Sequence, residues 1–193
     1  FSAGAVFLPD LKLTEAAART INRIVITACG TAAHAGMVGK ILIEALARVP
    51  VEVSIASEFR YADPIVDENT VLLAISQSGE TADTLAAMAE GRNRGATIWS
   101  IVNVIGSQAM RMAGGCIPMQ AGPEIGVAST KAFTTPLVDL YLLAILLGQL
   151  RGELDSEHVR QLLKELARLP QQVGTLLDQE PQVKKVARAL LNI

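Results

Sequence analysis

Short aliphatic runs alternate with longer stretches of helical character through the first 150 residues. Each run has the length and composition of a buried strand, and the stretches between them carry apolar residues at helical spacing. The pattern predicts strands at residues 23–28, 51–56, 70–75, 96–102 and 116–119. It predicts helices at residues 32–48, 81–94, 107–112 and 129–149. Strands that alternate with helices in this way predict a parallel sheet covered by helices on both faces.

Five such strands favour an α/β fold with a five-stranded, parallel, flavodoxin-like sheet flanked by helices. Ligands of these sheets bind beyond the carboxyl ends of the strands, near the point where the strand order reverses. The first and third predicted strands end in Cys29-Gly30-Thr31 and Ser76-Gln77-Ser78-Gly79. We therefore expect these two segments to lie at the functional edge of the sheet.

The chain divides into three parts by its pattern. We expect a helical lead-in at 1–22, the α/β domain at 23–150 and a helical tail at 151–193, interrupted by Pro170 and Pro181. The chain does not begin with Met and stops at Ile193 as an apolar run builds up. These features indicate a piece of a longer protein.

Composition excludes several classes of function. Half of the residues are hydrophobic but only 4% are aromatic, as in an aliphatic α/β core, and the formal net charge is −2 with no long basic run. A nucleic-acid partner is therefore not expected. The two cysteines have no metal-ligand spacing, so we expect no metal, no other cofactor and a reducing, cytoplasmic setting. The apolar run 136–148 is too short for a membrane span and carries Asp139, so we expect a buried helix there and no membrane partner.

The segment 76–81, Ser-Gln-Ser-Gly-Glu-Thr, joins a predicted strand to a predicted helix that Thr81 would open. Hydroxyls, an amide and free helix N–H groups would then face one point, which describes a phosphate site without a lysine. An ordinary Ser/Thr capping turn is equally compatible with these residues. A serine nucleophile is disfavoured, because a nucleophile elbow needs glycines two residues before and two after the serine.

The segment 28–36 offers fewer candidates. Gly30 permits a tight turn, and Thr31 would cap the next helix and add a hydroxyl to the same crevice. Free cysteine is more often a buried apolar residue than a nucleophile, so we expect Cys29 to be structural. We expect His34 to be a neutral structural or interface residue.

The segment 122–136 forms a predicted loop before the long apolar helix. Val127 to Ser129 offer backbone groups and a hydroxyl at the start of that helix. Lys131 could supply positive charge. Glu124 could be an acid or base, but a loop ion pair is the more common use of such a residue.

Four motifs together resemble the sugar-isomerase (SIS) domain, and more narrowly the first SIS subdomain of the glucosamine-6-phosphate synthases, the glutamine–fructose-6-phosphate aminotransferases. They are ACGT at 28–31, SEFRY at 57–61, ISQSGETADT at 75–84 and EIGVASTKAFTTP at 124–136. The match runs from about residue 24 to residue 150.

The resemblance implies a set of site residues. The substrate phosphate would be bound by Ser76, Gln77, Ser78 and Thr81. The sugar would be held by Cys29, Gly30 and Thr31 and by Val127, Ala128 and Ser129. The family often has a serine where this chain has Ala32, so one hydroxyl near the sugar is missing.

The resemblance also implies an activity that this chain does not contain in full. The family makes glucosamine 6-phosphate from fructose 6-phosphate and glutamine, with a glutaminase domain and two SIS subdomains, and its acid–base and Schiff-base residues belong to the second subdomain. We expect a fructose-6-phosphate-binding half with no catalytic residue of its own, inactive alone and part of a homodimer. A sugar-phosphate sensor in a regulator is the alternative. A stand-alone isomerase is weaker, because only Glu124 and His34 are acid or base candidates near the site.

Overall fold

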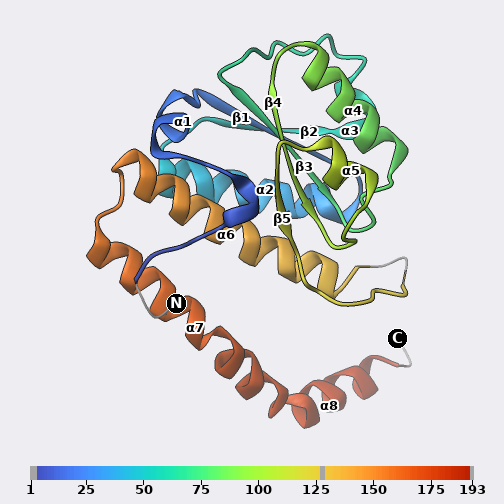
Figure 1. Ribbon diagram of the computed structural model, residues 1–193. Coiled ribbons are helices and arrows are strands. Elements are labelled where there is room, and N and C mark those ends of the chain that lie inside the picture. Colours follow the sequence, from blue (N-terminus) through green and yellow to red (C-terminus); the bar gives the residue numbers. More distant parts are fainter. Residues whose placement is uncertain (1–3, 127–128, 192–193) are drawn as a thin grey trace. The chain divides into compact units, whose positions relative to one another are not determined.

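Five parallel strands form the centre of the chain in the computed structural model, which describes residues 4–126 and 129–191 (Figure 1). The strands are β1 (Arg23–Ala28), β2 (Val51–Ile55), β3 (Thr70–Ser76), β4 (Thr97–Val102) and β5 (Gly115–Pro118). Their order is β2-β1-β3-β4-β5, and every neighbouring pair is parallel. This is the predicted flavodoxin-like order, and it reverses direction between β1 and β3.

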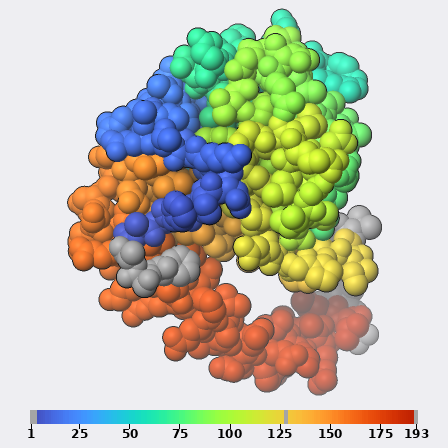
Figure 2. Space-filling view, viewed as in Figure 1, coloured from blue at the N-terminus to red at the C-terminus, as the bar shows by residue number. Residues whose placement is uncertain are grey.

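Helices cover both faces of the sheet. One face carries α2 (Thr31–Ala47) and α6 (Lys131–Arg151), and the other carries α3 (Ala56–Phe59), α4 (Ala82–Asn93) and α5 (Gln108–Met112) (Figure 1). Before β1 the chain forms η1 (Pro9–Leu11) and α1 (Glu15–Thr20). Figure 2 shows this N-terminal segment, in blue, on the outside of the domain.

Several predicted boundaries were wrong, each for a local reason. Ala56 opens the short helix α3 instead of ending β2. The predicted interruption at Pro170 was wrong, because this residue lies inside α7 (Ser156–Leu177). The predicted interruption at Pro181 is confirmed: Pro181 falls in the first turn of α8 (Glu180–Leu190), where a missing N–H costs nothing. Thr31 is the first residue of α2, and its predicted capping position is taken by Gly30.

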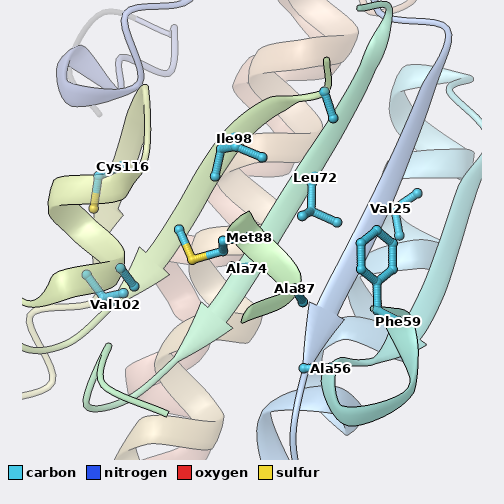
Figure 3. Close-up of a cluster of buried hydrophobic side chains, with 12 residues drawn as sticks. Val25, Ala56, Phe59, Leu72, Ala74, Ala87, Met88, Ile98, Val102 and Cys116 are labelled. Atoms are coloured by element: carbon cyan, nitrogen blue, oxygen red, sulfur yellow. The ribbon is translucent and has the colours of Figure 1, made fainter. Parts of the chain in front are cut away.

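The core on the α4 face is built from aliphatic residues with one aromatic anchor. Val25, Leu72 and Ile98 of neighbouring strands meet Met88 of α4, and Phe59 of α3 closes the cluster (Figure 3). All five are at most 4% exposed. Burial of such side chains contributes about 1.5–3 kcal/mol each, which fixes α4 and the loop before it on the sheet.

The core on the other face depends on a close approach between two helices. A Cβ atom on Gly39 of α2 would lie 2.8 Å from Cδ1 of Leu140 on α6. Among the described residues, α6 is the one helix long and apolar enough in composition to cross a membrane. Its buried residues and its packing along α2 make it a core helix of this domain, as the sequence predicted.

The chain separates into two compact units. Val6–Asp155 contains the sheet and its helices, and the other unit contains α7 and α8. Both of these helices expose large apolar side chains on an amphipathic face. On the two helices together these are Leu169, Val173, Leu176, Leu177, Val183, Val186 and Leu190, and Leu191 follows directly after α8.

The turn from β3 to α4 is held at a fixed conformation by Gly79. Its φ of +65° is in the left-handed region, which residues other than glycine rarely adopt. A Cβ atom at this position would lie 2.2 Å from Oγ of Ser107, in the connection between β4 and α5. The turn therefore needs glycine for both conformation and space.

One acidic side chain lies inside the domain. Asp139 of α6 is 9% exposed, and its Oδ2 atom has no hydrogen-bond partner among the described residues. Burial disfavours the charged form and raises the pKa of the carboxyl to about 7. The folded carboxyl thus holds its proton more tightly than the unfolded one. Its contribution to stability is complete below the ordinary pKa of 3.8 and is lost as the pH rises towards 7.

Asp139→Asn should stabilise the domain at pH 8 by roughly 4 kcal/mol, because the buried position no longer has to lose a proton. The folded and ordinary pKa values differ by about three units, and each unit corresponds to about 1.4 kcal/mol. Urea unfolding at pH 4.5, 6 and 8, followed by the fluorescence of buried Trp99, measures this change. The same urea series on Asp178→Asn, a substitution at an exposed carboxylate, is the control. Equal pH dependence in Asp139→Asn and the native chain would contradict the role assigned to burial.

Gly79→Ala should destabilise the domain by about 1–2 kcal/mol for the left-handed backbone and by about 1–3 kcal/mol more for the contact with Ser107. Gly106→Ala is the matched control. Its φ is +76°, but its Cβ would meet nothing within 4 Å, so only the backbone cost remains. The difference between the two unfolding free energies isolates the steric part. Equal losses would show that Ser107 moves aside freely.

Candidate functional site

A cleft of about 300 Å³ lies at the carboxyl edge of the sheet, where the strand order reverses. It is bordered by the residues that follow β1 and β3 and by the first turns of α2 and α4. The lining residues are Cys29, Gly30, Thr31, Ala32, Ile75, Ser76, Gln77, Ser78, Thr81, Thr84 and Ser129. The structure thus brings together every described residue that the sequence predicted for the site. Val127 and Ala128 lie outside the described residues.

The loop after β3 is shaped by its own serines. Oγ of Ser76 accepts a hydrogen bond from the Gly79 N–H at 3.0 Å, and Oγ of Ser78 accepts one from the Glu80 N–H at 3.1 Å. Oγ of Ser76 also lies 3.2 Å from Oγ1 of Thr81. A hydroxyl that accepts a bond keeps its own proton to donate. The loop therefore remains a source of donors although its oxygen atoms are engaged.

Two helices begin at the cleft without a side-chain cap. Thr81 is the N-cap of α4, but its side chain accepts no bond from the helix and instead pairs with Ser76. The N-cap of α2 is Gly30, which has no side chain to accept a bond. The first N–H groups of a helix lack internal partners, and the helix dipole adds positive potential there. The arrangement is suited to an anion.

The cleft has no charged lining. Among the described lining residues, Cys29 is the one with a titratable side chain, a half-buried free thiol. His34 is exposed on α2 and does not line the cleft. Any anion held here would be recognised by hydroxyls, an amide and backbone N–H groups. The described lining contains no carboxylate, imidazole or amine that could act as a general acid or base.

One polar lining residue was missed by the sequence-based prediction. Thr84 of α4 is 1% exposed, and its Oγ1 atom has no hydrogen-bond partner among the described residues. An unpaired buried hydroxyl costs about 1–3 kcal/mol. Its spacing of three residues from Thr81, which puts both on one helix face, was the available signal.

Glu124 and Lys131 support the start of α6. The Glu124 carboxylate accepts hydrogen bonds from the Ala132 N–H at 2.7 Å and from the Thr130 N–H at 3.3 Å. These bonds, with the Ala132 bond the strongest, lower the pKa of Glu124 despite some desolvation. Nζ of Lys131 donates to the Pro123 carbonyl at 2.6 Å. The expected loop ion pair of Glu124 is therefore a helix cap, and neither residue lines the cleft.

A metal site is not evident in the described part of the chain. Residues 4–126 and 129–191 contain no group of three or more His, Cys, Asp and Glu side chains placed to hold a metal ion.

The sequence is similar to a known domain family and to known enzymes. The model of the SIS domain family matches residues 19–146. A glutamine–fructose-6-phosphate aminotransferase (isomerizing) of Symbiobacterium thermophilum is 51% identical over 97% of this chain, and one of Clostridium tetani is 48% identical over 93%. The chain spans about a third of the length of these relatives, 31% and 30% respectively.

A solved structure extends the similarity to the fold. The C-terminal domain of glucosamine-fructose-6-phosphate aminotransferase from Francisella tularensis superposes with a TM-score of 0.91 at 35% identity. The match covers 97% of this chain and 53% of the other. The superposition agrees with the family model, which covers more than half of the residues, and the chain belongs to the SIS domain family.

Proposed function

We propose that this chain is the fructose-6-phosphate-binding half of the isomerase domain of an aminotransferase that makes glucosamine 6-phosphate. The observation that carries the proposal is the uncapped start of α4 beside the hydroxyls of Ser76, Ser78 and Thr81. A phosphate on a sugar is an anion rich in acceptor oxygens, and this group of donors matches it. The names of the relatives support the choice of sugar.

In this role the cleft fixes one end of the substrate. The loop after β3 would hold the phosphate, while Thr31 and Ser129 on the neighbouring segments would contact hydroxyl groups of the sugar. Binding energy far from the reacting carbons then orients them for chemistry. The role of this half is positioning.

The reacting groups would come from elsewhere in the parent protein. The described lining provides no acid or base, and the relatives are about three times as long as the chain. The exposed apolar side chains on the second half of α7 and on α8 support the same view, because exposed apolar patches of this kind mark interaction surfaces. We propose that 151–193 leads to a second SIS subdomain.

The remaining parts of the proposal follow from the relatives. They are named as aminotransferases, which favours an enzyme over a sugar-phosphate sensor. The parent protein would carry a glutaminase domain, form a homodimer and reside in the cytoplasm.

Ser78→Ala and Thr81→Ala should each weaken fructose 6-phosphate binding by about tenfold in the full-length protein, since each removes one donor to an anion. Titration calorimetry measures the dissociation constants. Thr175→Ala, which removes a hydroxyl that does not line the cleft, is the control. Unchanged affinity in both cleft variants would exclude the phosphate assignment.

The 193-residue chain alone should show no isomerase turnover of fructose 6-phosphate or glucosamine 6-phosphate, because the described cleft lining lacks an acid–base pair. A coupled assay at high protein concentration tests this. Turnover by the isolated chain, lost in Cys29→Ala or Glu124→Gln, would show that the chain contains its own catalytic groups.

A further inference from the structure

Backbone hydrogen bonds join the loop after β3 to residues 103–109, which comprise the connection between β4 and α5 and the start of α5. The Asn103 N–H donates to the Gln77 carbonyl at 3.1 Å, and the Ala109 N–H donates to the Gly79 carbonyl at 2.9 Å. Gly79 also packs against Ser107, as described above. Residues 103–109 thus support the loop although they do not line the cleft.

Glu80 provides a third connection, and it is the one made by a side chain. Its Oε1 atom accepts a hydrogen bond from the Gln108 N–H at 2.7 Å, across 28 residues of sequence. This bond satisfies the first N–H of α5, for which Ser107 provides no side-chain cap. Hydrogen bonds that involve a charged group are about twice as strong as neutral ones.

The same residue also touches the candidate ligand site through its backbone. The Glu80 N–H donates to Oγ of Ser78, and Glu80 directly precedes Thr81. Glu80 therefore joins two of the proposed phosphate-binding hydroxyls to the fixed start of α5.

The charge of Glu80 argues for a geometric role. A carboxylate beside a site for an anion lowers affinity by repulsion, and Glu80 itself does not line the cleft. Its presence next to Thr81 is better explained by the bond to Gln108 than by any contact with ligand.

We propose that Glu80 is a positioning residue, which holds the loop of Ser76 to Thr81 in its ligand-binding conformation through the Gln108 N–H. The proposal rests on the function proposed above, because the affected ligand is the sugar phosphate. Two variants separate the hydrogen bond from the charge. Glu80→Ala removes both, whereas Glu80→Gln removes the charge and keeps an acceptor oxygen.

Glu80→Ala removes the acceptor and should weaken fructose 6-phosphate binding by about tenfold in the full-length protein. Glu80→Gln keeps an acceptor oxygen, although its neutral hydrogen bond is weaker, and removes the repulsion of an anion, so it should retain most of the native affinity and bind more tightly than Glu80→Ala. Glu68→Ala, a carboxylate before β3 at the opposite end of that strand, should leave the dissociation constant unchanged. Titration calorimetry gives all four values.

Amide hydrogen exchange provides a measurement that does not need ligand. Glu80→Ala should speed exchange at Gln108 and through residues 77–80, and Glu80→Gln should restore rates close to the native ones. A lower melting temperature without a change in affinity or local exchange would show a purely structural role and overturn the proposal. If Glu80→Gln loses as much affinity as Glu80→Ala while retaining native exchange, the carboxylate acts by charge and the proposal is wrong.

The two proposals fail in different ways. If the native protein binds neither fructose 6-phosphate nor glucosamine 6-phosphate, the proposed function is wrong and the ligand role of Glu80 is lost with it. If the native protein binds and Glu80→Ala binds equally well, the positioning role alone is wrong.

Discussion

The pairing of β1 with β3 is the constraint on which the site depends. Ala28 lies opposite Ile75 in the parallel register, so Cys29 and Ser76 leave the sheet side by side although they are far apart in sequence. The chains that follow turn to opposite faces, into α2 on one side and α4 on the other. The starts of α2 and α4 and the two polar loops before them therefore lie close together because β1 pairs with β3.

The packing of each face keeps this meeting point in position. Gly39 lets α2 approach α6 closely, and Met88 anchors α4 among Leu72 and Ile98. Helix starts in a ligand site need this support, because a shift of about 1 Å at a binding group is costly. The aliphatic core that the composition predicted is thus also what orients the donors.

Much of this arrangement was predictable from sequence, because periodicity and strand endings are local signals. The five strands, their parallel order and the convergence of Thr31 with Ser76 and Ser78 follow from such signals. The contact of Glu80 with Gln108 could not be predicted, because it joins two loops whose proximity exists only after β3 and β4 have paired. The N-cap position of Gly30 could not be predicted for a different reason: threonine is the more common N-cap residue, so the sequence favoured Thr31.

The uncapped starts of α2 and α4 have a consequence for evolution and engineering of the fold. A good cap contributes about 1 kcal/mol to a helix, and neither of these helices has a side-chain cap. The groups that a cap would satisfy are the ones that face the cleft. Stability of the free chain and affinity for an anion therefore compete for the same N–H groups, so selection for thermal robustness alone would tend to erode the site.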